Sequence, residues 1–282
     1  MTKFEILAEG FTFLEAPRWR DGLLWMSDMF GEAIYKVTPT GSASRVASML
    51  GRPSGLCFAP SGALIAVSMR DRKLYTVNED GEQSVYADLS ELSASDLNDC
   101  VIDQIGNIYV GNFGYDLAAG EPPQPTNLFR VAPNGDIDSV AERLDFPNGC
   151  VITPDGETLI CAETNGHRLT AFTRNKDGAL SERRVWADLR SHRPDGICLD
   201  AAGAIWVASL ETGEFLRVTE GGQQVKTIKS RSRHAIACAL GGQDGRTLFA
   251  LTYDGKLADV MSGAKRARIE ICDVDTPAAG SP

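Results

Sequence analysis

Short apolar runs alternate with turn residues along the whole chain, and they do so in a repeating order. Each copy has a polar residue, a turn, a short apolar run and a closing glycine, and a second apolar run follows that glycine. The clearest copy begins at Arg193-Pro194-Asp195-Gly196 and closes at Gly203. Six copies occur, 40 to 50 residues apart, with closing glycines at Gly22, Gly62, Gly106, Gly156, Gly203 and Gly245. A repeat of this period is a stronger indication of the fold than any single motif.

The pattern within each copy predicts an all-β fold. Short runs rich in β-forming residues, bounded by Asp-Gly, Asn-Gly and similar turns, are typical of strands and hairpins. About four such runs per copy, in six copies, predict a six-bladed β-propeller with four-stranded blades. We expect one domain over residues 1–282. We also expect the opening strand (4–13) and the final strand (267–271) to complete one blade together and close the ring.

The polar residue of each copy occupies a fixed register. It lies eight positions before the closing glycine in four copies, and a similar offset identifies a residue in the first and last; the six are Glu15, Ser54, Asn98, Asn148, Asp195 and Ala237. Because equivalent positions of all blades surround one axis, we expect these side chains to gather at one mouth of the central channel. Carboxylate and carboxamide oxygens suit a hard or borderline divalent cation. The alternative is that Asn-Gly and Asp-Gly merely form turns, which does not account for Glu15.

Four motifs carry a resemblance to a known family: Leu14-Glu15-Ala16-Pro17-Arg18-Trp19, Leu97-Asn98-Asp99, Phe146-Pro147-Asn148-Gly149 and Arg193-Pro194-Asp195-Gly196. On these motifs the chain resembles, over essentially its whole length, the SMP-30/gluconolactonase/luciferin-regenerating-enzyme family. The resemblance implies hydrolysis of a small lactone, of a sugar acid or a related compound. It also implies one divalent cation (Ca, Zn, Mn or Fe) bound by Glu15, Asn148 and Asp195, with Asn98 near the metal or substrate.

Three protein ligands leave positions open on such a cation. It could then polarise the lactone carbonyl and lower the pKa of a bound water. Asp195 is the candidate catalytic proton shuttle. For substrate binding we add Asp116, by its offset within the insert 112–126, and His167, which follows a strand at the mouth.

One position departs from the family pattern. Sugar-lactone members carry an Arg two residues before the Asn that matches Asn98, and this chain has Asp96 there. A carboxylate cannot supply the paired donors of an arginine. The resemblance therefore extends to the metal ligands and not to the sugar specificity.

Composition narrows the remaining possibilities. The formal net charge of −10 makes nucleic acid an unexpected partner. Seven cysteines without a CxxC spacing, five of them in the same apolar run of successive copies, predict core fillers in a reducing, cytoplasmic compartment. No apolar run approaches the roughly 18 residues of a membrane span, and no signal-peptide core is expected at the N-terminus.

Two other readings stay open. The chain could be a non-enzymatic propeller that binds a metal or small ligand, since a propeller fold does not decide function. It could also be a phosphotriesterase-like hydrolase with the same site. A zinc triad is disfavoured because the three histidines form no such set, and a serine hydrolase because no GxSxG motif occurs.

Overall fold

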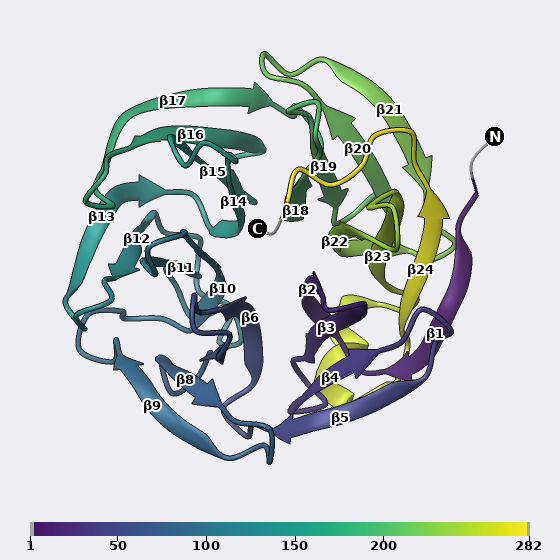
Figure 1. Ribbon diagram of the computed structural model, residues 1–282, viewed down its shortest axis with the longest axis horizontal. Coiled ribbons are helices and arrows are strands. Elements are labelled where there is room, and N and C mark those ends of the chain that lie inside the picture. The colour runs from purple at the N-terminus through teal and green to yellow at the C-terminus, as the bar shows by residue number, and fades with distance from the viewer. Residues whose placement is uncertain (1–2, 281–282) are drawn as a thin grey trace.

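The computed structural model describes residues 3–280, which form six four-stranded antiparallel sheets arranged around a central axis (Figure 1). This confirms the predicted six-bladed β-propeller. In Figure 1 the first strand of each blade lies nearest the axis and the last lies at the rim. No helix within residues 3–280 is long and apolar enough to cross a membrane.

Within each blade the strands follow one another from the axis outward. Blade 1 contains β2 (Leu14–Arg20), β3 (Leu23–Asp28), β4 (Ala33–Val37) and β5 (Ala43–Ser48). Blade 2 contains β6 (Pro53–Phe58), β7 (Leu64–Ser68), β8 (Lys73–Val77) and β9 (Gln83–Asp88). Blade 3 contains β10 (Leu97–Ile102), β11 (Ile108–Asn112), β12 (Thr126–Val131) and β13 (Ile137–Leu144).

The second half of the ring has the same order. Blade 4 contains β14 (Pro147–Ile152), β15 (Thr158–Glu163), β16 (Arg168–Arg174) and β17 (Leu180–Asp188). Blade 5 contains β18 (Pro194–Leu199), β19 (Ile205–Ser209), β20 (Glu214–Val218) and β21 (Gln224–Lys229). Blade 6 contains β22 (His234–Gly241), β23 (Thr247–Tyr253), β24 (Ala267–Asp273) and β1 (Glu5–Phe11), with the short 3-10 helix η1 (Leu257–Ser262) between β23 and β24.

Blade 6 closes the ring with strands from both ends of the chain. The N-terminal β1 pairs antiparallel with β24, from Glu5 opposite Ile271 to Phe11 opposite Ala267. Figure 1 shows the purple β1 beside the yellow β24 at the rim. The predicted closure is therefore confirmed, and separating the blades requires breaking this non-local pair as well as the packing between blades.

Glycines allow the inner strands to approach one another closely around the axis. A Cβ added at Gly196 of β18 would lie 2.4 Å from the Cβ of Ala237 on β22, which no real pair of carbons tolerates. Gly149 and Gly55 face the next blade's backbone in the same way. The glycine that follows the polar residue in three of the six copies is thus required by the narrowness of the channel.

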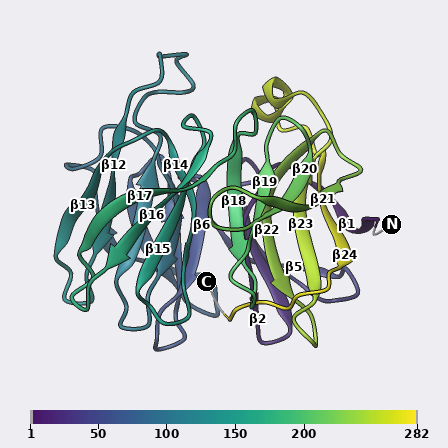
Figure 2. The same ribbon diagram turned by 90° about the horizontal axis from the view of Figure 1, so that it is seen from above.

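The two faces of the ring differ. The loop between β11 and β12 projects from one face, which we call the loop face, and the segment 274–280 crosses the other, which we call the tail face (Figure 2). On the tail face Ala278 pairs with Asp200 and its amide donates to the Gly245 carbonyl at 2.9 Å. The closing glycines of the repeats lie on the tail face, so the inner strands begin at the loop face.

Candidate metal and catalytic site

The six register residues all lie on the innermost strands, at or near their loop-face ends. Five of them are the second residue of their strand, and Ala237 is further along β22. All six are buried: Glu15, Ser54, Asn98, Asn148, Asp195 and Ala237. The structure thus places the six residues at equivalent places on the inner strands around the channel.

A local irregularity recurs at the register position of every blade. In all six inner strands the pairing with the second strand shifts at this point, for example between Glu15 and Arg18 and between Pro194 and Ile197. A bulge of this kind takes residues out of the ladder and re-aims their side chains. Four register residues are consequently left out of the regular pairing, namely Ser54, Asn98, Asn148 and Asp195. Glu15 and Ala237 stay in the ladder at the edge of the shift, opposite Ser27 and Leu251.

Each of the two amide side chains is fixed by a hydrogen bond that it donates to an acceptor in blade 4. Asn98 Nδ2 donates to the Pro147 carbonyl at 3.2 Å, and Asn148 Nδ2 donates to Thr164 Oγ1 at 3.1 Å. Thr164 Oγ1 in turn donates to the Pro194 carbonyl, next to Asp195, at 2.7 Å. With both NH2 groups engaged, the two amide oxygens are left as acceptors, and within residues 3–280 no hydrogen bond reaches either of them.

The two carboxylates of the constellation are buried, and within residues 3–280 neither has an ion-pair partner. Asp195 is 4% exposed, and its Oδ1 has no hydrogen-bond partner among the described residues. Burial, aided by the negative charge of Asp99, raises the pKa of Asp195 to about 8, although the neighbouring amide of Asn148 opposes the rise. Burial together with the charges of Asp195 and Asp99 also raises the pKa of Glu15 well above its ordinary value. Two buried carboxylates in mutual repulsion, beside free amide oxygens, form a set that a cation would stabilise.

This donor set contains only oxygen atoms, which suit a hard divalent cation. Residues 3–280 contain no group of three or more His, Cys, Asp or Glu side chains gathered as a metal site. A cation here would therefore use the two carboxylates and the amide oxygen of Asn148, a combination that calcium and manganese accept.

An ion pair that sequence reasoning missed lies deeper in the channel. Arg18 on β2 reaches β10, where its Nη2 donates to Asp99 Oδ1 at 3.1 Å and to the Cys100 carbonyl at 2.8 Å. Both side chains are only about a tenth exposed. The repeat contained a signal: the position three residues after the register residue is charged only at Arg18, and in the other copies it holds Cys57, Val101, Val151, Cys198 and Leu240.

At the rim of the mouth, side-chain contacts join the β11–β12 loop to blade 4 and to the segment between blades 4 and 5. Arg193 Nη2 donates to Asn165 Oδ1 at 2.6 Å, and Asn165 Nδ2 donates to the Tyr115 hydroxyl at 3.2 Å. Phe113 stacks on Phe146 with ring centroids 4.7 Å apart. The predicted insert is thus held against blade 4 by polar and aromatic contacts.

Asp96 lies half-buried at the rim, two residues before Asn98. Burial raises the pKa of its carboxyl, while Arg70 and Arg52 oppose that rise and Asp116 adds to it. Asp116 is exposed, and its Oδ1 accepts a hydrogen bond from the Ala119 amide at 2.9 Å. Its carboxylate therefore caps a turn of the insert and lies within electrostatic reach of Asp96.

His167 lies in the turn between β15 and β16, which also contains Thr164. Its backbone is in the left-handed region (φ 52°), and its carbonyl accepts from the Leu189 amide at 2.9 Å. Its Nδ1 is buried and has no partner among residues 3–280. The backbone hydrogen bond connects His167 to the end of β17, and within the described part of the chain no hydrogen bond joins it to the channel.

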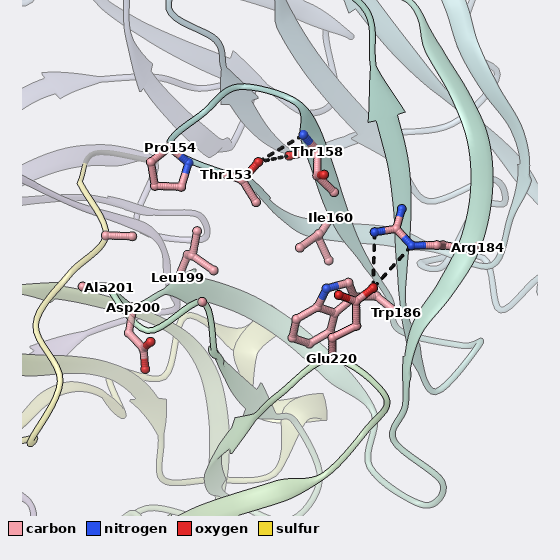
Figure 3. Close-up of a pocket in the computed structure, with 12 residues that line it drawn as sticks. Thr153, Pro154, Thr158, Ile160, Arg184, Trp186, Leu199, Asp200, Ala201 and Glu220 are labelled. Carbon is pink, nitrogen blue, oxygen red and sulfur yellow. Dashed lines mark hydrogen bonds and ion pairs between the residues drawn. The ribbon is translucent and has the colours of Figure 1, made fainter.

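Two cavities on the tail face contain none of the register residues. One, of about 360 Å³, lies between blades 4 and 5; Ile160, Trp186 and Leu199 line it, and the Arg184–Glu220 pair lies at its edge (Figure 3). The other, of about 510 Å³, opens at the tail-face end of the channel and includes Arg18. Neither cavity is therefore part of the constellation formed by the register residues.

Fold and site define a six-bladed propeller whose channel mouth carries a cluster of carboxylate and amide oxygens. A sequence model of the SMP-30/Gluconolactonase/LRE-like region matches residues 10–254, and the chain belongs to this family. This confirms the resemblance found on the motifs.

Three relatives illustrate the similarity. The chain is 25% identical to pentonolactonase XacC of Haloferax volcanii over 277 residues, covering 95% of this chain and 92% of the relative. It is 27% identical to 6-deoxy-6-sulfogluconolactonase of Pseudomonas putida over 247 residues, covering 83% and 81%. The solved structure of regucalcin from Agrobacterium tumefaciens, described as a calcium-binding protein, superposes with a TM-score of 0.78 at 18% identity, covering 96% and 95%.

Proposed function

We propose that the protein is a lactonase that hydrolyses a small lactone to its hydroxy acid and depends on one divalent cation. The observation that carries the proposal is the buried pair Glu15 and Asp195 at the channel mouth, with Asp195 Oδ1 left unpartnered among the described residues. The names of the two relatives, a pentonolactonase and a sulfogluconolactonase, support the reaction class.

Glu15, Asn148 and Asp195 would hold the cation. When bound, the cation would supply a Lewis acid that polarises the lactone carbonyl and makes a coordinated water more acidic. Calcium is favoured by the all-oxygen donor set and by the description of the Agrobacterium relative as calcium-binding. Manganese, iron and zinc remain alternatives that the metal titration below distinguishes.

The protein's own residues account for the remaining steps. Asp195 accepts the proton of the attacking water as the new C–O bond forms at the carbonyl carbon. It then returns that proton to the ring oxygen as the ester bond breaks, which releases the hydroxy acid. Thr164 and the Pro147 carbonyl hold the amides of Asn148 and Asn98 in place, so that the mouth is preorganised before substrate arrives.

The proposed substrate contacts are Asn98, Asp116 and His167. Asn98 has the strongest support because its Oδ1 accepts no hydrogen bond from residues 3–280. For Asp116 the support is its electrostatic contact with Asp96 at the rim. For His167 it is a buried Nδ1 without a partner in the described residues. Asp96 itself can accept hydrogen bonds from substrate hydroxyls, which an arginine at this position could not do.

The test is acid release from a panel of aldonolactones and simple aliphatic and aromatic lactones. The protein is first stripped of metal, and Ca²⁺, Mn²⁺, Zn²⁺ or Fe²⁺ is added back singly. We expect hydrolysis of a subset of lactones that returns only with an added ion. Undiminished hydrolysis by the stripped protein would contradict the metal dependence.

Two further outcomes would replace the proposal. Stoichiometric metal binding without any hydrolysis would favour the non-enzymatic binding propeller. Hydrolysis of a phosphotriester such as paraoxon, with none of the lactones cleaved, would favour the phosphotriesterase-like reading.

A further inference from the structure

Four charged side chains are buried together along the channel. They are Glu15, Arg18, Asp99 and Asp195, each 8% exposed or less. Their influence on one another is direct: Asp195 and Asp99 raise the pKa of Glu15, Arg18 opposes them, and Asp99 raises the pKa of Asp195. Fully ionised, the four carry a formal charge of −2.

The hydrogen bonds show which of the four charges are paired. Arg18 spans the channel from β2 to β10 and gives three hydrogen bonds, to Asp99 Oδ1 and to the carbonyls of Cys100 and Pro17. Asp99 Oδ1 also accepts from the Cys100 amide at 2.8 Å. Arg18 and Asp99 therefore satisfy each other, whereas Glu15 and Asp195 are left with the uncompensated charge.

One cation at the rim, Arg193, opposes the rise in the pKa of Asp195, but it forms its ion pair with Glu211 and not with that carboxylate. Arg193 is half-buried, and its Nη1 lies 2.9 Å from the Glu211 carboxylate while its Nη2 binds Asn165. Its charge is thus paired at the surface, where it is also screened by water.

Propeller packing does not require an ion pair at this level of the channel. At the position of Arg18 the other five blades carry Cys57, Val101, Val151, Cys198 and Leu240. A buried ion pair seldom adds stability over apolar side chains of similar volume. A feature that the fold does not need, placed directly beneath the constellation, points to a role in the constellation's charge.

We propose that the Arg18–Asp99 pair is a specificity-determining element that sets the charge of the site at −2 and so selects a divalent over a trivalent cation. This inference rests on the proposed metal site and adds to it. Without Arg18, Asp99 would be a third uncompensated carboxylate, and the site would favour ions of higher charge. Without the charge of Asp99, Arg18 would repel any cation bound at Glu15 and Asp195.

The test compares Ca²⁺ with Tb³⁺, an ion of similar size and higher charge, by calorimetric titration of metal-stripped protein at pH 8. The variants are Arg18→Met, Asp99→Asn and the double variant. We expect Arg18→Met to raise the preference for Tb³⁺ over Ca²⁺ by about tenfold or more, and Asp99→Asn to weaken Ca²⁺ binding by about tenfold or more. In the double variant both quantities should return to near wild type, because the charge is again −2.

Two controls guard against trivial explanations. Arg18→Lys keeps the charge and should keep the wild-type ion preference. Arg20→Met removes the same charge from the same strand at a more exposed place, paired with Asp21, and should leave both affinities unchanged. Circular dichroism and thermal unfolding show whether each variant folds; if Arg18→Met does not, the double variant and Asp99→Asn still test the prediction.

The outcomes separate the two proposals. If wild-type protein binds neither ion, the proposed metal site fails. If it binds Ca²⁺ but Arg18→Met and Asp99→Asn shift the two affinities in the same direction, or not at all, the charge-setting role is overturned while the metal site stands.

Discussion

Two buried carboxylates in neighbouring blades, Glu163 and Asp195, have opposite environments. Glu163, at the end of β15, is fully buried and accepts from Arg168 Nε at 3.0 Å, Arg168 Nη2 at 2.7 Å, Arg183 Nη2 at 3.1 Å and the Asp145 amide at 2.7 Å, as well as from the Thr170 hydroxyl. Burial alone would raise its pKa, but the hydrogen bonds from Arg168 and Thr170 outweigh that effect and lower it.

Asp195 is similarly buried without such donors, and its pKa rises to about 8. A carboxylate that its own protein satisfies is a structural element. One that is buried, unpartnered and grouped with a second carboxylate costs stability unless something from outside the chain binds it. The comparison therefore separates Glu163, which ties β15 to β16 and β17, from Asp195, which we assign to function.

The substitution Asp195→Asn tests this comparison with the largest expected effect. We expect turnover to fall by about 10³-fold, because proton transfer and a metal ligand are lost together. The metal-free variant should be at least as stable as wild type, since a repelled buried charge is removed. Initial rates on the best lactone and urea unfolding check both expectations, and a less stable, still active variant would contradict the assignment.

Glu163→Gln should give the converse result. Removing one partner from this charged network leaves Arg168 and Arg183 short of a carboxylate, and we expect a loss of about 3 kcal/mol in the free energy of unfolding. The lactonase rate per folded molecule should change little. Glu220→Gln, which breaks the exposed pair with Arg184, is the matched control and should cost well under about 1 kcal/mol.

The pH dependence of stability should differ in sign for the two groups. The pKa of Asp195 is raised on folding from 3.8 to about 8, so the folded metal-free protein holds a proton that the unfolded chain releases. Its stabilising contribution is present in acid and is lost as pH rises towards 8, by up to about 1.4 kcal/mol per pH unit. The lowered pKa of Glu163 acts in the other direction, and its contribution is lost as pH falls.

Thermal unfolding of metal-free wild type and Asp195→Asn between pH 5 and 8.5 measures this difference. The stability of the variant relative to wild type should grow with pH, and saturating Ca²⁺ should remove the trend in wild type. A constant difference over this range would show that Asp195 does not titrate there.

The smallest of these effects concerns Thr164, whose hydroxyl joins Asn148 to the Pro194 carbonyl. Thr164→Val keeps the shape and removes the hydrogen bonds, and we expect metal affinity to fall by about tenfold, as for other residues that orient a ligand. Thr153→Val, a hydroxyl change on the tail face, is the control. Calorimetric titration with Ca²⁺ distinguishes the two.

Sequence alone was sufficient for the parts of the molecule that repeat. The register of Asn148 and Asp195 followed from the closing glycines, and an unpaired strand at each end indicated the β1–β24 closure. The register also identified Glu15, although that residue lies seven rather than eight positions before its closing glycine. Periodic patterns could do this because a propeller repeats one geometry around an axis.

The parts that depend on contacts between blades could not be read in this way. Thr164 and the Arg18–Asp99 pair act through partners 30 to 81 residues away, which no local pattern encodes. Asp116 lies in a long connection between the second and third strands that blades 1, 2, 4 and 5 lack, so an offset could not fix its contacts. The donors around Glu163 come from several different segments and gave no sequence signal.

The most direct test of the account is calorimetric titration of a divalent cation into metal-stripped wild type and Asp195→Asn at pH 7, in buffers of different ionisation enthalpy. We predict one ion bound per wild-type chain, with protons released because the raised pKa of Asp195 keeps that carboxyl largely protonated before binding. The variant should bind far more weakly and release fewer protons. Equal binding by both proteins, or no binding by wild type, would contradict the claim that the Asp195 carboxylate is a metal ligand.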